Sequence, residues 1–175
     1  ISHRMADEPA PYEIKWDGAE AGEPSVDPSK EGKAAASYPN GDKYEGTYAN
    51  GKRDGKGAYT WKAPALAEGE EEQKPGTVYE GDFKSGMKHG KGVLKCEDGS
   101  EYRGDFKDGV KSGQGVYYYA NGDSYLGEWA NDVRHGKGTY SFAKCKSIYS
   151  GNWENGSLKK GFWKLADGTT QVMKN

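Results

Sequence analysis

The sequence predicts an all-β fold: an elongated single-layer antiparallel meander of stacked hairpins, with an aromatic and glycine-lined groove and a flexible N-terminal leader. Three observations predict it. A Tyr-x-Gly motif occurs five times, and its last four copies are spaced by 23, 23 and 24 residues. A second aromatic follows each tyrosine by four residues, and a turn-forming pair follows that aromatic. A repeat of this length is typical of stacked units that share one core.

The first strand of each unit carries both aromatics on one face, because side chains alternate along an extended strand. A glycine lies between them on the same face, where it leaves room for a neighbouring backbone or ring to approach closely. The tyrosines are Tyr44, Tyr79, Tyr102, Tyr125 and Tyr149; the second aromatics are Tyr48, Phe83, Phe106, Trp129 and Trp153; the glycines are Gly46, Gly81, Gly104, Gly127 and Gly151.

Each first strand ends at a pair of residues that tolerates the positive φ of a tight turn. These pairs are Asn50-Gly51, Ser85-Gly86, Asp108-Gly109, Asn131-Asp132 and Asn155-Gly156. The return strand opens with Gly-x-Gly in the first four units and then alternates apolar and polar residues. Its apolar pairs are Tyr59/Trp61, Leu94/Cys96, Tyr117/Tyr119 and Tyr140/Phe142. A second bend, such as Asn121-Gly122, leads into the next unit.

The composition also favours a thin aromatic sheet. Only 33% of the residues are hydrophobic, but 13% are aromatic, so rings must replace aliphatic side chains in the core. A single hairpin is marginally stable, and stacking along the array should supply the rest. The two cysteines, Cys96 and Cys145, have no spacing typical of a disulfide framework or a metal site, and a reducing intracellular compartment is expected.

The chain divides into three segments. Residues 1–4 precede Met5 and are predicted to be a cloning remnant, residues 5–30 an acidic flexible leader, and residues 31–175 the repeat array, with an insertion at 63–77. The leader contains one alternating apolar cluster, Tyr12, Ile14 and Trp16. It predicts either a short strand that packs on the first repeat or a docking peptide for another protein. No secretory segment or membrane span is expected.

Basic residues gather in or beside the turns on one side of the predicted sheet. This possible anionic-partner rail comprises Lys52, Arg53, Lys84, Lys88, Lys107, Lys111, Arg134 and Lys137. It could bind anionic lipid headgroups or acidic protein tails such as those of tubulin, or it could simply protect the sheet from edge-to-edge aggregation. Nucleic acid is not an expected partner, because the net charge is −2 and the pI is about 6.0.

The sequence predicts no catalytic site, no cofactor and no metal site. His89 and His135 occupy equivalent positions two repeats apart and are not expected to meet. Glu45 and Glu80 are the middle residues of their Tyr-x-Gly motifs, but Arg103 takes that position in the next unit. The paired glycines lack the strand, longer motif and helix of a phosphate-binding loop. An enzyme is therefore not expected.

Tyr-Glu-Gly at 44–46 and 79–81, with Gly-x-Gly about eleven residues downstream, resembles MORN repeats from about residue 32 to 164. The stretch EWANDVRHGKG at 128–138 further resembles the radial-spoke head MORN proteins of motile cilia and flagella. These resemblances imply a non-catalytic structural scaffold in the cytoplasm and cytoskeleton, at the axoneme, that binds a segment of another axonemal protein.

The resemblance to the radial-spoke proteins implies a partner-binding groove on the aromatic face. The expected groove residues are Tyr44, Tyr48, Tyr79, Phe83, Tyr102, Phe106, Tyr125 and Trp129. Two alternatives stay open: a protein that tethers membranes or binds phosphoinositides through the basic rail, and a self-assembling cytoskeletal organiser of a protist. Trp153, Phe162 and Trp163 have no successor unit to cover them, so they predict self-association, such as a homodimer, through the C-terminal repeats.

Overall fold

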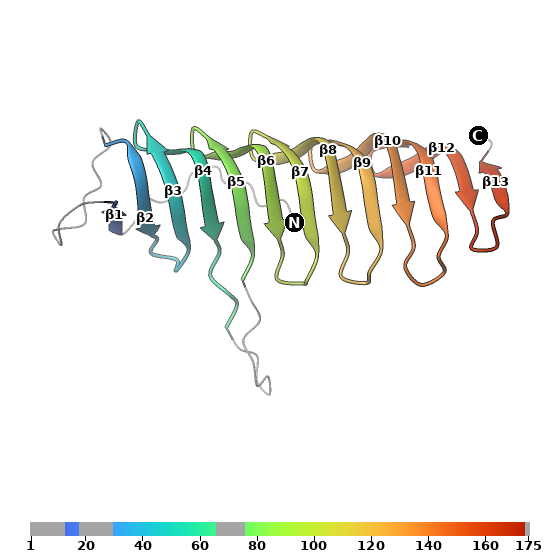
Figure 1. Cartoon of the computed structure of the whole chain (residues 1–175), viewed down its shortest axis with the longest axis horizontal. Coiled ribbons are helices and arrows are strands. Elements are labelled where there is room, and N and C mark those ends of the chain that lie inside the picture. Colours follow the sequence, from blue (N-terminus) through green and yellow to red (C-terminus); the bar gives the residue numbers. More distant parts are fainter. Residues whose placement is uncertain (1–12, 18–29, 66–75, 174–175) are drawn as a thin grey trace.

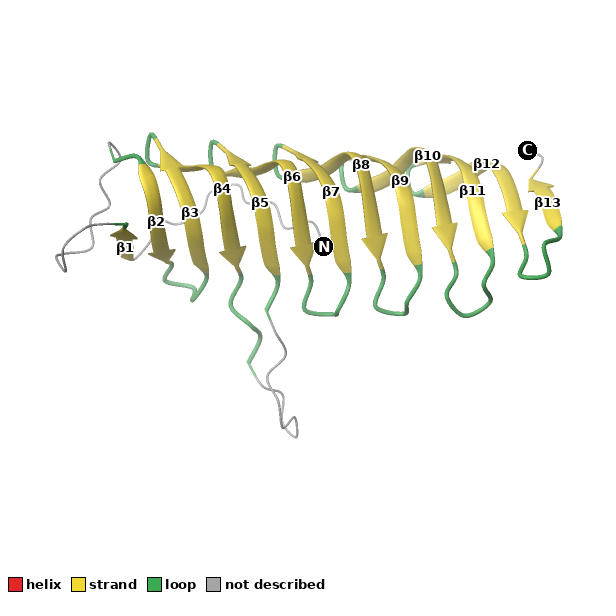
Figure 2. Cartoon of the chain, in the orientation of Figure 1, coloured by secondary structure: helices red, strands yellow, loops and turns green. Residues whose placement is uncertain are grey.

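The structure, a computed structural model, describes residues 13–17, 30–65 and 76–173. These residues form one open antiparallel sheet of thirteen strands whose spatial order is their order in the sequence (Figure 1). The described residues contain no helix (Figure 2). The predicted all-β meander is confirmed. The strands are β1 Glu13–Trp16, β2 Gly32–Ser37, β3 Lys43–Ala49, β4 Lys52–Thr60, β5 Val78–Lys84, β6 Met87–Lys95, β7 Glu101–Lys107, β8 Val110–Tyr118, β9 Ser124–Ala130, β10 Val133–Ser141, β11 Ile148–Glu154, β12 Ser157–Lys164 and β13 Thr170–Met173.

The tight turns lie where the sequence predicts them. Both residues of each of the five pairs have positive φ, for example Asn131 at 50° and Asp132 at 68°. Two successive positive φ angles define the type I′ turn, whose twist matches that of a hairpin. The first glycine of the return strand also has positive φ, as at Gly113, and the pairing of β7 with β8 shifts register next to it. The Gly-x-Gly therefore forms a bulge in the hairpin.

A row of facing glycines crosses the sheet, with one glycine on each strand from β3 to β12. It consists of Gly46, Gly57, Gly81, Gly92, Gly104, Gly115, Gly127, Gly138, Gly151 and Gly161. In the hairpin of β7 and β8, the Tyr102 ring lies over two of these glycines. An added Cβ on Gly115 would lie 2.5 Å from two carbon atoms of that ring. The prediction that the glycines permit close approach is confirmed.

The core is a zigzag of rings in edge-to-face contact. Tyr102 meets Phe106 of its own strand at 5.1 Å between ring centroids and Trp129 of the next unit at 5.3 Å. The same pair of contacts recurs from Tyr44 through to Trp153, with interplanar angles between 81° and 89°. Edge-to-face geometry places the positive edge of one ring against the negative face of the next. Each unit therefore completes the core of its neighbour.

The N-terminal end of this core is covered by β1. Ile14 is 5% exposed, and the Trp16 ring lies 5.7 Å from that of Tyr48. β1 pairs with β2, so these residues form the short strand on the first repeat that the alternating cluster allowed. Tyr12, the cloning remnant and nearly all of the predicted leader lie outside the described residues, as does the centre of the 63–77 insertion.

The last unit departs from the pattern. In the other units the first tyrosine contacts the second aromatic of its own strand. Here the Tyr149 ring instead packs on Phe142 at 4.9 Å and on Trp163, its pairing partner across β11 and β12, at 5.1 Å. The three atoms nearest to an added Cβ on Gly151 would be backbone atoms of Lys160 and Gly161, whereas at Gly115 they are atoms of a tyrosine ring and its hydroxyl. Gly161 of β12 takes the place of the second glycine of the motif, opposite Gly151, but Lys159 stands where the other units have the first glycine, so the bulge of this hairpin differs.

Candidate partner-binding groove

The eight residues predicted for the groove come together, but as the core of the sheet. They are 0–6% exposed, and they are Tyr44, Tyr48, Tyr79, Phe83, Tyr102, Phe106, Tyr125 and Trp129. Hydrogen bonds to the backbone hold several of these side chains: the Tyr102 hydroxyl donates to the Asp105 carbonyl at 2.9 Å, and Trp129 Nε1 donates to the Gly115 carbonyl at 3.3 Å. A direct role in holding a partner stays a prediction for these residues. Their burial points to support of the surface above them.

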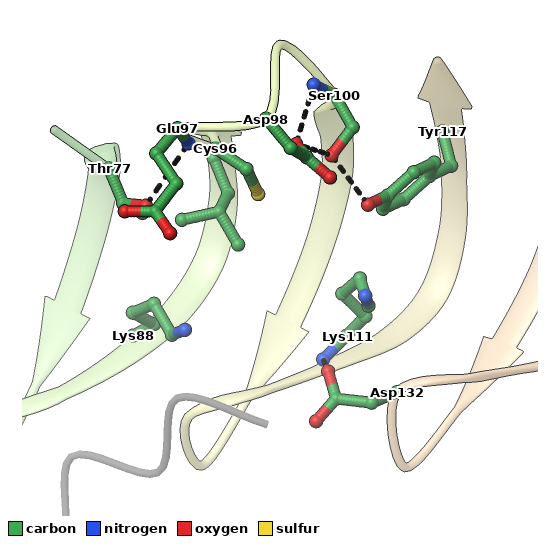
Figure 3. Close-up of a pocket in the computed structure, with 10 residues that line it drawn as sticks. Thr77, Lys88, Cys96, Glu97, Asp98, Ser100, Lys111, Tyr117 and Asp132 are labelled. Atoms are coloured by element: carbon green, nitrogen blue, oxygen red, sulfur yellow. Dashed lines mark hydrogen bonds between the residues drawn. The ribbon is translucent and has the colours of Figure 1, made fainter. Parts of the chain in front are cut away.

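The open surface lies over the return strands. A hollow of about 320 Å³ lies between Lys88 and Lys111 (Figure 3). A second, of about 280 Å³, shares Lys111 with the first and extends to Arg134. A third, of about 450 Å³, shares Arg134 with the second and reaches Met173. Because neighbouring hollows share lining residues, they form one groove along successive repeats, called the groove below.

Four half-buried rings line this groove on the side of the turns that join one hairpin to the next. Each ring contacts the next one along the row, which consists of Tyr117, Tyr119, Tyr140 and Phe142. The centroids of Tyr117 and Tyr119 are 4.6 Å apart, and those of Tyr119 and Tyr140 are 5.4 Å apart. Their polar tips are also held: Tyr117 exchanges a hydrogen bond with Ser100 at 2.8 Å. The sequence placed these rings on the return strands but did not assign them to the groove.

Four members of the basic rail occupy one repeated position on the aromatic face of the sheet. We call Arg53, Lys88, Lys111 and Arg134 the cation row; each follows the tyrosine of its unit by nine residues. Lys111 Nζ lies 5.1 Å from the ring centroids of Tyr117 and Trp129. The Arg134 guanidinium lies 4.5 Å from Trp153. Rings of this kind attract cations through their negative faces.

The other four members of the rail do not join this row. Lys52, Lys84, Lys107 and Lys137 are exposed. The alternation of side chains along the strands distinguishes the four residues of the cation row from the four exposed lysines. Each member of the cation row precedes an inward residue of its return strand by six positions, an even number, as Lys111 precedes Tyr117. Lys107 instead follows the inward Phe106 by one position, so it points to the other face.

The arginines and lysines of the cation row are bonded differently. Arg53 Nη2 donates to the Gly86 carbonyl at 2.6 Å, and Arg134 Nη2 donates to the Gly156 carbonyl at 2.6 Å. Each arginine therefore ties its unit to the tight turn of the next one. Within the part of the chain that the structure describes, neither Lys88 Nζ nor Lys111 Nζ makes a hydrogen bond or an ion pair within 4.0 Å.

Burial shapes the electrostatics of these lysines. Lys88 is 3% exposed, and this desolvation lowers the pKa of its ammonium group to about 8, against the opposing attraction of Asp132 and with added repulsion from Lys111. Burial lowers the pKa of Lys111 as well, again opposed by Asp132. The Asp132 carboxylate accepts the backbone N–H of Lys111 at 2.8 Å. The first hollow is therefore lined by one buried lysine, Lys88, and one half-buried lysine, Lys111.

Figure 3 shows how the groove presents these groups. Lys88 from β6 and Lys111 from β8 lie on the floor, and Ser100 and Tyr117 lie above them. Asp98 accepts the Ser100 backbone N–H at 2.8 Å, and hydrogen bonds from Ser100 lower the pKa of its carboxyl group. Glu97 and Asp98 are exposed at the rim.

The residues predicted for self-association do not form one exposed patch. Trp153 is 5% exposed, and its Nε1 donates to the Gly138 carbonyl at 2.9 Å. Trp163 is half-buried, and its Nε1 has no partner among the described residues. Phe162 is 37% exposed and pairs with Val172 of β13, which is 71% exposed.

The described residues offer few groups for catalysis or metal binding. The two histidines remain in separate hairpins, and His89 Nδ1 lies 3.7 Å from Asp108 Oδ1. The described residues include no group of three or more His, Cys, Asp or Glu side chains able to hold a metal ion. They also include no helix long and apolar enough to span a bilayer.

Comparison with known proteins gives matches of unequal weight. MORN repeat-containing protein 3 of Xenopus laevis is 37% identical over 59 residues, which is 34% of this chain and 20% of that protein. Two solved structures of the Drosophila melanogaster Sas-4 TCP domain also match. One, in complex with a proline-rich motif of Ana2, has a TM-score of 0.42 and 14% identity over 83% of this chain and 89% of the other. The second has a TM-score of 0.39 and 13% identity over 83% and 98%. At these TM-scores the likeness supports no conclusion on function.

The MORN repeat model matches four segments, at residues 44–62, 79–101, 102–124 and 125–144. Each match begins at the tyrosine whose ring lies over the facing glycines, so the family repeat and the structural unit coincide. The chain therefore belongs to the family of MORN-repeat proteins.

Proposed function

We infer that this chain is a non-catalytic scaffold that holds a segment of another protein in its groove, as a component of a ciliary or flagellar axoneme. The open groove is the observation that carries the first part, because half-buried rings and cations alternate along consecutive repeats. Tyrosine, tryptophan and arginine dominate interface energies, and an elongated surface suits an extended partner.

The axonemal assignment rests on residues 128–138, which resemble radial-spoke head MORN proteins. The chain covers a fifth of the length of the curated relative that it matches. The alternative that deserves a test is binding to anionic lipid. It would use the four exposed lysines of the rail, which are free to approach a membrane surface.

Photo-crosslinking from two adjacent positions tests the groove. Tyr119 lines the groove, and Tyr118 is 46% exposed on the opposite face. We expect benzoylphenylalanine at position 119 to capture a protein partner in ciliated cells, and the same group at position 118 to capture none. Equal capture from both positions would contradict a partner held in the groove.

Localisation of the tagged protein tests the axonemal part. We expect signal along the axoneme that survives detergent extraction. Signal at the plasma membrane that is lost in the double variant Lys84→Glu/Lys107→Glu would instead support lipid binding through the exposed lysines.

A further inference from the structure

Among the residues that the structure describes, the two lysines of the cation row lack the hydrogen-bond partners that the two arginines have. Two members of the row, Arg53 and Arg134, direct their guanidinium groups to the carbonyl of the following turn. Lys88 and Lys111 occupy the same position in the two intervening units, yet within the described residues neither Nζ has a hydrogen bond or ion pair. Both line the same hollow. Lys88 is buried and Lys111 half-buried, and each ammonium group lies over ring faces instead of against a hydrogen-bond acceptor. Partial loss of water without an acceptor is unfavourable for an ammonium group, so the hollow favours an anionic occupant.

The charges around this hollow support the same conclusion. Asp132 is the carboxylate that acts on both lysines, but it also accepts the Lys111 backbone N–H at 2.8 Å. Cys96 lies close enough to act on both lysines as well, and Lys88 and Lys111 repel each other. Glu97 and Asp98 also line the hollow, but at its exposed rim, so Asp132 is the one carboxylate of the three that acts on both lysines, which leaves room for one further negative charge beside them.

We propose that the groove recognises an acidic polyproline II segment whose carboxylates recur at every third residue and pair with Lys88 and Lys111; this rests on the proposed function, in which the groove holds a protein segment. Carboxylates supply both the countercharge and the hydrogen-bond acceptors that the two lysines lack.

The spacing of the units favours this conformation. Successive members of the cation row are separated by two strands, or roughly 9.6 Å at about 4.8 Å per strand. A polyproline II helix has three residues per turn and rises about 3.1 Å per residue, so carboxylates at i and i+3 lie on one side at roughly 9.3 Å. In a β-strand, positions i and i+3 face opposite sides. An acidic polyproline II segment therefore matches the unit spacing without distortion.

The rings of the groove fit the same ligand. Tyr117, Tyr119 and Tyr140 form a half-buried strip beside Lys111, with centroids 4.6 and 5.4 Å apart along the strip. Aromatic-lined grooves are the usual docking surface for polyproline II segments, whose conformation is set before binding. The lysines pair with the acidic residues of the segment, and the rings contact the residues between them.

A membrane fits this site less well. Glu97, Asp98 and Asp132 line the first hollow, and the first two are exposed at the rim. An anionic bilayer would meet these carboxylates before it reached Lys88, which is 3% exposed. A narrow polypeptide can place single carboxylates between them.

The test is a fluorescence anisotropy titration of the whole chain with two labelled peptides of identical composition. One consists of six Glu-Pro-Pro triplets, and the other carries its six glutamates in one block. We expect the triplet peptide to bind at least about tenfold more tightly, because only its carboxylates match the unit spacing. Equal affinity for the two peptides would overturn the proposal.

Matched variants assign the contact. Lys111→Met and, separately, Lys88→Met should weaken binding of the triplet peptide about tenfold. Lys107→Met makes the same change of net charge at the exposed end of β7 and should change the affinity by less than about twofold. Thermal unfolding of each variant verifies its fold. Equal effects at positions 107 and 111 would show unspecific charge attraction and would overturn the proposal.

Two further arms separate the other occupants. Binding restricted to vesicles that contain phosphatidylinositol 4,5-bisphosphate, or to a helical peptide with glutamate at every seventh residue, would overturn the polyproline II ligand. Failure of the peptides with retained crosslinking from position 119 would refute this inference alone. Failure of both would also refute the proposed function.

Discussion

The ring of Tyr102 on β7 lies against the backbone of Gly115 on β8, where a Cβ would come to 2.5 Å from two of its carbon atoms. Gly104 faces Gly115 across the strand pair, so the ring covers both residues. The aromatic ladder depends on this contact, because the same ring also meets Phe106 and Trp129. Similar contacts recur at Gly57, Gly92 and Gly138.

Substitution Gly115→Ala should lower the free energy of unfolding by at least about 2 kcal/mol, because the methyl group must displace a packed ring. Gly99→Ala is the control: Gly99 has a φ of 84° but open space around it, so only backbone strain of about 1 kcal/mol is expected. Urea denaturation measures both. A smaller loss at position 115 than at position 99 would contradict the packing described here.

Tyr102→Phe isolates the hydroxyl group. The hydroxyl donates to the Asp105 carbonyl at 2.9 Å, and removing it should cost about 1 kcal/mol of unfolding free energy. Tyr118→Phe, on a residue that is 46% exposed, should cost less than about 0.5 kcal/mol. Equal losses in the two variants would argue against a stabilising role for the buried hydroxyl.

The stability of the protein should rise between about pH 8 and pH 9. Burial lowers the pKa of Lys88 from 10.5 to about 8, so in this range the unfolded chain binds a proton that the folded chain does not. Above about pH 9 stability should fall again, because burial raises the pKa of several tyrosines in the folded state, Tyr44 and Tyr79 among them, while their unfolded counterparts ionise.

Lys88→Met should remove much of the rise between about pH 8 and pH 9 and add about 1–3 kcal/mol to the unfolding free energy at pH 7, since it eliminates a buried charge. Lys107→Met, at the exposed end of β7, should leave the pH profile unchanged. Denaturation curves at a series of pH values measure both effects. An unaltered profile in Lys88→Met would show that Lys88 is not the group responsible.

Self-association through the C-terminal repeats stays a prediction, and the structure suggests where to disrupt it. Phe162 and Val172 face each other on β12 and β13 and are 37% and 71% exposed. We expect Phe162→Lys to shift any dimer to monomer in light scattering at high concentration. Leu126→Lys, at an apolar residue that is 59% exposed elsewhere in the sheet, should not. A monomeric parent protein would contradict the prediction.

The repeat motif predicted most of the fold because each of its residues has a local physical role. Asn131-Asp132 adopts the positive φ angles that its turn requires, and Gly115 makes room for the ring of Tyr102. The groove was harder to predict. Alternation could have placed Lys111 with Tyr117, but it does not reveal that Tyr102 is fully buried, with Phe106 of its own strand and Trp129 of the next unit against its ring. That burial moves the accessible surface to the return strands.

The most direct test of the groove compares two charge reversals, Lys111→Glu and Lys107→Glu, in the full chain expressed in ciliated cells. Both change the net charge equally, but Lys111 lines the groove and Lys107 is exposed at the end of β7. We predict that Lys111→Glu abolishes capture of the partner crosslinked from position 119, and that Lys107→Glu preserves it. Capture that survives in Lys111→Glu and is lost in Lys107→Glu would contradict the groove and favour the exposed lysines as the binding surface.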